Sequence, residues 1–367
     1  MLSGQVSPFE FEKEMPLFMD KIKEELTYPL AWGNSPITNF ADWKAVAQAK
    51  ALQCMLPPPP KAKEANLEVI AIEKRKGYEA RKIRFNISDY SRIDAYLLVP
   101  DGNGPFPGIV LLHDHGAHFS IGKEKVIRPF DLDSLRLKDA DEWVDKCYEG
   151  QYPGDFMASQ GYVVIAIDAL FWGDRGRKEG VSYDMQQAVA SNFELLGRSW
   201  SAFITYEDMY TAELMSQLGE VDDNKIACLG FSMGAYRSWM LAALSDKVKV
   251  GAAICWMNTT DQQMSQDNTR NKGGSAFSML IPGLRNYLDY PHIASIACPK
   301  PMLFFNGKKD KLFPVEGVQV AYNEMRKVWE SQFAGDKLIT KLWDAPHVFN
   351  KEMQKEVLDF FNKELEY

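Results

Sequence analysis

The chain has 367 residues, 46% of them hydrophobic and 25% charged, a composition typical of a globular enzyme. Its net charge of −8 argues against a nucleic-acid-binding protein, because phosphate contact requires a basic face and none is apparent. The five cysteines are scattered without Cys/His metal spacing, so we expect neither a disulfide scaffold nor a metal site, and no cofactor. The sequence shows no apolar run long enough for a membrane span and no signal-peptide pattern at its N-terminus. These features leave the oligomeric state open.

The N-terminal part differs in pattern from the rest of the chain. Residues 9–30 are amphipathic, which predicts a helical segment on the outside of the core. The four prolines at 57–60 require an extended chain and end this region. We therefore predict an N-terminal helical extension with a Pro-rich linker at 1–66 and a main domain at 67–367.

The main domain alternates between strand and helix patterns. Strands are predicted at 67–74, 78–85, 92–99, 108–113, 162–168, 225–230, 248–255, 302–305 and 338–342, and helices at 185–218 (in two pieces), 235–244, 318–333 and 351–365. The later strands are continuous apolar runs, as expected of parallel strands buried on both faces. The predicted fold class is therefore α/β, a mostly parallel sheet flanked by helices. Residues 120–154 and 258–290 are predicted to be insertions over the carboxyl edge of the sheet, where such folds bind ligands.

One motif suggests a catalytic nucleophile. Residues 230–234 read Gly-Phe-Ser-Met-Gly, the G-x-S-x-G pattern of a strained strand-to-helix turn that exposes a serine Oγ. The pattern alone is weak, but here it follows the apolar strand KIACLG and opens the helical run AYRSWMLAALS. We predict Ser232 as the nucleophile and the backbone N–H of Met233 as one oxyanion donor.

An acid and a base follow in the order that this fold requires. Asp310 lies just past the strand at 302–305 and His347 just past the strand at 338–342, so both side chains are expected at the edge that carries Ser232. The alternative base is His292, whose acid would then come from Asp289. Asp344 is the alternative acid, although its place in the loop of His347 favours a turn-forming role.

The loop after the strand at 108–113 reads Asp-His-Gly-Ala-His, and it follows another histidine, His113. In this fold the corresponding loop supplies the second oxyanion N–H, which we assign to His115 or to Gly116. Three histidines within six residues also permit a metal site with Asp114, but no second ligand cluster completes one. We favour the oxyanion role.

With these motifs in this order, the chain resembles the dienelactone-hydrolase-like and acetyl-xylan-esterase-like branch of the α/β hydrolases. More narrowly, it is similar to the carbohydrate esterases of gut Bacteroidetes that remove acetyl or methyl groups from plant polysaccharides. The resemblance runs from about residue 67 to the C-terminus and rests on LLHDHG, DALFWGDRGR, GFSMGAYR, PMLFFNGKKDKLFP and DAPHVF. Dienelactone hydrolases themselves carry a cysteine nucleophile, whereas position 232 is serine. That difference indicates ordinary ester hydrolysis.

The resemblance implies a serine esterase that acts on a carbohydrate ester, with a slight preference for the methyl ester of a uronic acid, as in pectin, over acetyl esters. It also implies a periplasmic or secreted location, with the cytoplasm as the alternative. Candidate substrate-binding residues are Trp172, Arg175, Trp256 and Arg270. For Trp172, Arg175 and Trp256 a purely structural role competes with substrate binding. A peptidase, a lipase and an inactive carbohydrate-binding homologue are the remaining alternatives.

Overall fold

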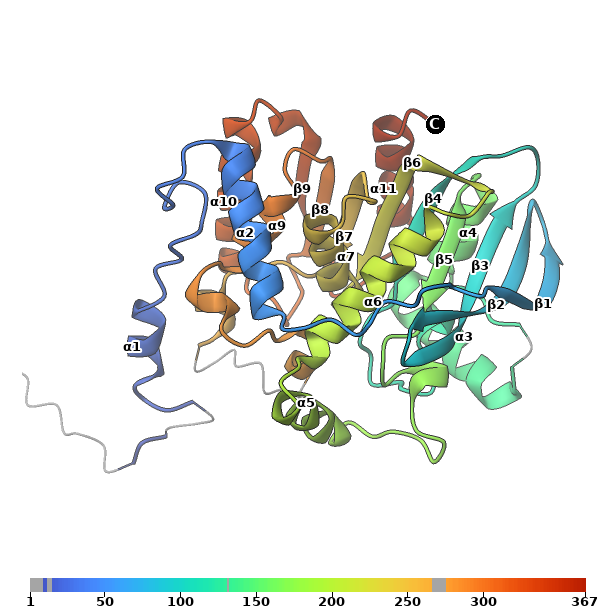
Figure 1. The fold of residues 1–367 in the computed structure, drawn as a ribbon, viewed down its shortest axis with the longest axis horizontal. Coiled ribbons are helices and arrows are strands. Elements are labelled where there is room, and N and C mark those ends of the chain that lie inside the picture. The colour runs from blue at the N-terminus through green and yellow to red at the C-terminus, as the bar shows by residue number, and fades with distance from the viewer. Residues whose placement is uncertain (1–8, 12–14, 131, 266–274) are drawn as a thin grey trace, which may run out of the picture.

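A computed structural model describes residues 9–11, 15–130, 132–265 and 275–367. Nine strands form one sheet in the order β1-β2-β3-β5-β4-β6-β7-β8-β9 (Figure 1). Their bounds are β1 Glu68–Arg75, β2 Tyr78–Ser88, β3 Ser91–Pro100, β4 Phe106–Leu112, β5 Val163–Ile167, β6 Val221–Phe231, β7 Val250–Ile254, β8 Met302–Gly307 and β9 Leu338–Trp343. Each of the nine predicted strands is present.

The sheet is antiparallel at one end and parallel elsewhere. Strands β1, β2 and β3 pair antiparallel, and β3 pairs antiparallel with β5. The remaining pairings, along β5-β4-β6-β7-β8-β9, are all parallel. Parallel strands end at a common edge, so the loops that follow β4 to β9 meet there. The predicted fold class is confirmed.

Helices cover both faces of the sheet, as the continuous apolar strands require. One face packs against α2 (Phe40–Cys54), α6 (Trp200–Met215), α7 (Met233–Leu244), α9 (Tyr290–Ala294) and α10 (Val315–Ser331). The other face packs against α3 (Ser134–Tyr148), α4 (Pro153–Ser159) and α11 (Lys351–Glu364). Alternate residues of β6 point to the two cores: Ile226 and Cys228 to the first, Ala227 and Leu229 to the second.

The N-terminal region differs from the prediction. Among the described residues of 9–30 the structure has one short helix, α1 (Met19–Glu24), with no buried residue, and the main helix of the N-terminal region is α2. Asn39 caps α2 by accepting a hydrogen bond from the N–H of Asp42, and the apolar positions Trp43, Ala47 and Ala51 face the core. The Pro-rich segment then crosses the helical layer towards β1 (Figure 1), held by hydrogen bonds from tyrosines of α6.

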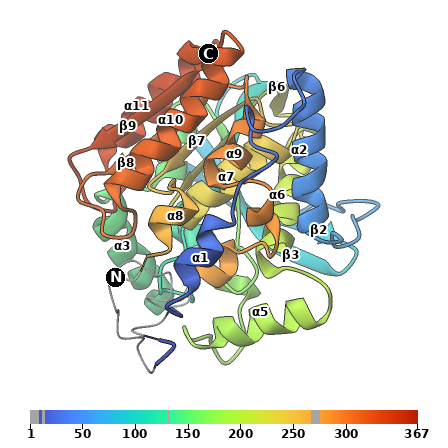
Figure 2. The same cartoon turned by 90° about the vertical axis from the view of Figure 1, so that its left-hand side faces the viewer.

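The two predicted insertions contain short helices. Residues 120–154 contain the 3₁₀ turn η1 (Lys123–Lys125), helix α3 and the start of α4. Residues 258–290 contain α8 (Thr260–Gln263), η3 (Ser275–Met279) and η4 (Leu284–Asn286). Helix α5 (Met185–Leu195) lies in the lower part of the molecule, away from the sheet, in both Figure 1 and Figure 2. No helix in the described ranges has both the length and the hydropathy to cross a membrane.

Candidate active site

Ser232 lies between β6 and α7 in a strained backbone conformation. Its φ of 56° and ψ of −121° are rare for a residue with a side chain, and it occupies the N-cap position of α7. The backbone N–H of Ser232 donates to the carbonyl of Ile254 on the neighbouring strand β7 at 2.8 Å. This bond fixes the turn, and the side chain stays partly exposed.

Gly230 and Gly234 of the motif are needed because a side chain at either position would clash with the backbone, and not because of an unusual φ. A Cβ on Gly230 would lie 2.0 Å from the carbonyl oxygen of Gly234, and a Cβ on Gly234 would lie 1.9 Å from that of Leu112. The second contact places the start of α7 directly against the end of β4. The turn at Ser232 is therefore packed against the loop predicted to complete the oxyanion hole.

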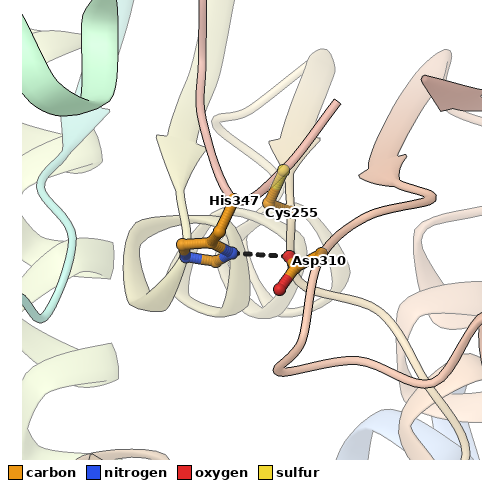
Figure 3. Close-up of side chains that lie close together, drawn as sticks. All are labelled: Cys255, Asp310 and His347. Carbon is orange, nitrogen blue, oxygen red and sulfur yellow. Dashed lines mark hydrogen bonds and ion pairs between the residues drawn. The ribbon is translucent and has the colours of Figure 1, made fainter. Parts of the chain in front are cut away.

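Asp310 and His347 form a hydrogen-bonded pair past the ends of β8 and β9. Figure 3 shows the imidazole Nδ1 directed at the carboxylate, with 2.6 Å between Nδ1 and Oδ2. The second carboxylate oxygen accepts the N–H of Leu312 at 2.9 Å, so both oxygens of the buried carboxylate are engaged. Since Nδ1 faces Asp310, Nε2 is the nitrogen available for proton transfer.

The imidazole of His347 is brought next to the nucleophile turn by ring packing. Its centroid lies 4.7 Å from that of Phe231, the residue before Ser232, and 6.1 Å from the stacked ring of Phe313. Side chains from β6, β8 and β9 thus converge at one edge of the sheet. The order of the motifs predicted that these residues would lie at one edge, and their catalytic roles remain predictions.

Cys255 is a neighbour of the pair that the sequence did not single out. It follows β7 with a φ of 60°, and its Sγ lies within 4.8 Å of ligand atoms of Asp310 and His347 (Figure 3). Burial and the Asp310 carboxylate both raise the pKa of this thiol, so it stays protonated and non-nucleophilic. Its Sγ is 3.5 Å from the carbonyl oxygen of Val348, consistent with a packing role in the base loop.

The alternative base and acid have other partners. His292 accepts the N–H of Asp289 through Nδ1 at 3.0 Å in the capping box of α9, and its Nε2 contacts Glu324 at 3.0 Å. Asp344 forms an exposed ion pair with Lys309 at 3.0 Å. Neither contact leads to Ser232 or to His347.

The loop predicted to supply the second oxyanion donor, residues 114–118 (the oxyanion loop below), is held by buried donors on its carbonyl side. The carbonyl of His115 accepts the indole N–H of Trp172 at 2.7 Å and the ammonium of Lys125 at 2.8 Å. The Asp114 carboxylate accepts from Trp143 Nε1 at 3.0 Å and from the Tyr148 hydroxyl at 2.7 Å.

Gly116 has a φ of +42°, and a Cβ there would lie 2.8 Å from the Trp143 ring. In the described part of the chain, the backbone N–H groups of Gly116 and Met233 have no hydrogen-bond acceptor.

The three histidines of this loop do not converge on a metal position. His113 is fully buried and accepts the N–H of Ala169 at 3.0 Å, and burial lowers its pKa far below the usual value, so it is neutral. His115 bonds Gln186 of α5 at 2.7 Å between Nε2 and Oε1. His118 pairs with Asp139 of α3. Each ring therefore positions a different element.

The predicted substrate-binding residues are corrected by their burial. Trp172 is fully buried and stacks on Trp200, so its ring offers no face to a sugar. Trp256 is likewise buried, among aromatic side chains. Arg175 is neutralised by a two-pronged ion pair with Glu207, at 2.5 and 2.7 Å, and cannot also bind a uronate. Arg270 lies outside the described residues.

A second buried ion pair links α7, the helix that follows Ser232, to α6 and to the end of β4. Arg237, five residues after Ser232, binds Asp208 of α6 through two bonds of 2.6 and 2.9 Å and donates to the carbonyl of His113 at 3.3 Å. The sequence signal was an arginine one helical turn beyond the G-x-S-x-G motif. Its partner on α6 could not be identified without the fold.

The sheet order, the strained serine and the Asp–His pair define an α/β hydrolase with a serine-type site. The sequence matches the Abhydrolase family over residues 32–331, and the chain belongs to that family. It is 26% identical over 278 residues to a Bacillus subtilis (strain 168) protein, YtaP, provisionally described as a hydrolase. That match spans 76% of this chain and 85% of YtaP.

Two solved structures are similar in fold. One, from Bacteroides fragilis NCTC 9343, is provisionally described as an acetyl xylan esterase (TM-score 0.63, 19% identity, 83% of this chain and 75% of that one). The other is a glucuronoyl esterase from Solibacter usitatus (TM-score 0.63, 13% identity, 90% of this chain and 95% of that one). At these identities the similarity is evidence for the fold alone.

Proposed function

We propose that the protein is a serine esterase that hydrolyses carboxylic esters of plant polysaccharides. The observation that carries this proposal is the hydrogen-bonded Asp310–His347 pair, with its carboxylate buried, packed beside the strained Ser232 turn. A pair of this kind is needed to activate a hydroxyl nucleophile, and a binding module has no use for it.

The proposed reaction proceeds through an acyl-enzyme. Ser232 Oγ attacks the ester carbonyl while His347 Nε2 takes its proton, and Asp310 stabilises the imidazolium through Nδ1. The N–H groups of Met233 and of His115 or Gly116 hold the oxyanion. His347 then protonates the leaving alcohol, and water, deprotonated by the same imidazole, releases the acid.

The polysaccharide substrate is supported by the similar proteins, one described as an acetyl xylan esterase and the other as a glucuronoyl esterase. Among the possible esters we propose the methyl ester of a uronic acid, as in pectin. The second candidate, removal of acetyl groups, is favoured by the Arg175–Glu207 pair, because it takes away one cation predicted to bind a neighbouring uronate. We further propose a periplasmic or secreted location, which cell fractionation would test.

A panel of methylated pectin, acetylated pectin and acetylated xylan tests the substrate, with release of methanol and acetate as the readout. We expect methanol release from methylated pectin to be fastest and Ser232→Ala to reduce kcat by a factor on the order of 10⁶. Faster release of acetate would favour the second candidate. Binding of a polysaccharide without release of either product would contradict the esterase proposal.

The acid and the base are tested with matched pairs of variants. His347→Ala and Asp310→Asn should each lower kcat by at least about 10³-fold. His292→Ala and Asp344→Asn are the controls and should stay within about threefold of the wild type, because their side chains bind Glu324 and Lys309 instead. Loss of activity in His292→Ala alone would overturn the assignment of His347.

A further inference from the structure

Residues 123 and 125, two lysines of the single turn η1, lie entirely within the protein, and each has a different set of partners. Lys123 binds the carboxylates of Asp168 and Asp174, each at 2.7 Å, and Glu124 at 3.0 Å. This cluster ties η1 to the loop after β5. Lys123 therefore neutralises an acidic cluster and makes no bond to the oxyanion loop.

Lys125 is directed instead at the backbone of the oxyanion loop. Its ammonium donates to the carbonyl of His115 at 2.8 Å and lies 3.4 Å from the carbonyl oxygen of Asp114. The Asp114 carboxylate is 3.8 Å away, and the ring of Trp143 lies 5.4 Å from the ammonium. A buried cation thus contacts two consecutive peptide groups.

Those two peptide groups carry the candidate oxyanion donors. In a planar trans peptide the N–H points away from the carbonyl of the same unit. The carbonyl of Asp114 is joined to the N–H of His115, and the carbonyl of His115 to the N–H of Gly116. A donor on the carbonyl side orients each unit and polarises it, which makes the opposite N–H a stronger donor.

We propose that Lys125 is a positioning residue for the oxyanion hole, which orients and polarises the peptide groups of His115 and Gly116 from behind. The proposal rests on the proposed esterase function and holds whichever of the two N–H groups binds the oxyanion. It assigns a second, weaker contribution of the same kind to Trp172, whose indole N–H shares the His115 carbonyl at 2.7 Å.

Lys125→Met keeps the length of the side chain and removes its charge and its hydrogen bonds. We expect kcat for p-nitrophenyl acetate to fall about 10–100-fold with KM within about threefold, because the oxyanion exists only in the transition state. The affinity for phenylboronic acid, whose adduct with serine places an oxygen in the oxyanion hole, should fall in parallel. Trp172→Phe removes one neutral donor, and we expect a loss of about 3–10-fold in kcat.

Lys123→Met is the matched control, since it removes an equally buried lysine of the same turn that does not touch the loop. We expect it to lower the melting temperature and to leave kcat within about threefold. Equal losses of kcat in Lys123→Met and Lys125→Met would overturn the proposal, as would an unchanged kcat in a folded Lys125→Met. If Lys125→Met does not fold, an unchanged kcat in Trp172→Phe overturns it.

Assays of the wild-type protein distinguish failure of the Lys125 proposal from failure of the proposed esterase function. Labelling of Ser232 by a fluorophosphonate and hydrolysis of p-nitrophenyl acetate are measured before any variant is compared. A wild type that does neither overturns the esterase function and the role of Lys125 together. An active wild type with an unaffected Lys125→Met overturns the role of Lys125 alone.

Discussion

At the scale of single residues, the candidate site depends on backbone geometry as much as on the side chains of Ser232, Asp310 and His347. The placement of Asp310 and His347 at the edge that carries Ser232 could be predicted from chain order and strand ends, because parallel strands bring their following loops to one edge. The catalytic roles of the three residues remain predictions. For Trp172 and Arg175 the structure favours the structural alternative over substrate binding, since their burial is decided by Trp200 and Glu207 on a helix distant in sequence. No local pattern reveals such partners.

Gly234 offers a direct test of whether the site depends on the close backbone contact between β4 and α7. Gly234→Ala would place a Cβ 1.9 Å from the Leu112 carbonyl oxygen, so β4 and α7 must separate at the oxyanion loop. We expect a loss of roughly 3 kcal/mol or more in the free energy of unfolding and a near-complete loss of activity. Gly219→Ala, where a Cβ meets nothing within 4 Å, is the control in urea titration and should leave both nearly unchanged.

At the scale of elements, the strands were easier to predict than the first helices. Continuous apolar runs mark buried parallel strands, and the nine were placed within a few residues of their observed ends. The helix predicted within 9–30 is shorter than expected, because amphipathic periodicity was given more weight than Pro16 and Pro29, which limit a helix there. The Asn39 cap and the spacing of Trp43, Ala47 and Ala51 were the signal for α2.

Helix α2 is expected to contribute to stability as part of the main core. Trp43 is fully buried and donates its indole N–H to the carbonyl of Leu30 at 2.8 Å. Trp43→Ala should therefore lower the free energy of unfolding by about 3–5 kcal/mol. Val46 lies on the same helix with 42% of its surface exposed, so Val46→Ala should cost less than about 1 kcal/mol. Similar losses in both variants would show that α2 is only loosely attached.

At the scale of the whole molecule, buried ion pairs join segments that are distant in sequence. The division at residue 66/67 remains a prediction, and α2 shares the hydrophobic core of the main domain. The network around Lys123 joins the 120–154 insertion to the loop after β5 and adds Arg136 of α3. The charge composition of the sequence could not predict this ion-pair network, because isolated charged residues in a sequence are usually exposed.

This network gives the stability a dependence on acid pH. Burial raises the pKa of Asp174, but ion pairs with Lys123 and Arg136 outweigh it and lower the pKa to about 2, below the usual 3.8. A lowered carboxyl pKa stabilises the fold above the unfolded-state value, and the contribution disappears as the pH falls from about 4 to about 2. Asp174→Asn should thus cost about 1–2 kcal/mol at pH 7.

Urea unfolding at pH 7 and at pH 3 measures this dependence. The difference between wild type and Asp174→Asn should shrink at the lower pH, since the carboxyl is then largely protonated in the unfolded chain while it stays mostly ionised in the folded protein. Asp359→Asn, which breaks an exposed helical ion pair with Lys355, is the control and should change little at either pH. A difference that is the same at both pH values would contradict the role of the Asp174 charge.

The position of α2 also has a consequence for protein synthesis. Lys44 of α2 donates to the carbonyl of Cys298 at 3.0 Å, across 254 residues of sequence. At about 5–20 residues per second, a ribosome needs roughly 10–50 s to make the chain between them. During that interval the segment from α9 to Cys298, which is part of the surface against which α2 packs, is incomplete. Part of the surface that buries α2 is therefore made long after α2 itself, and a nascent-chain chaperone has time to bind the helix before it docks.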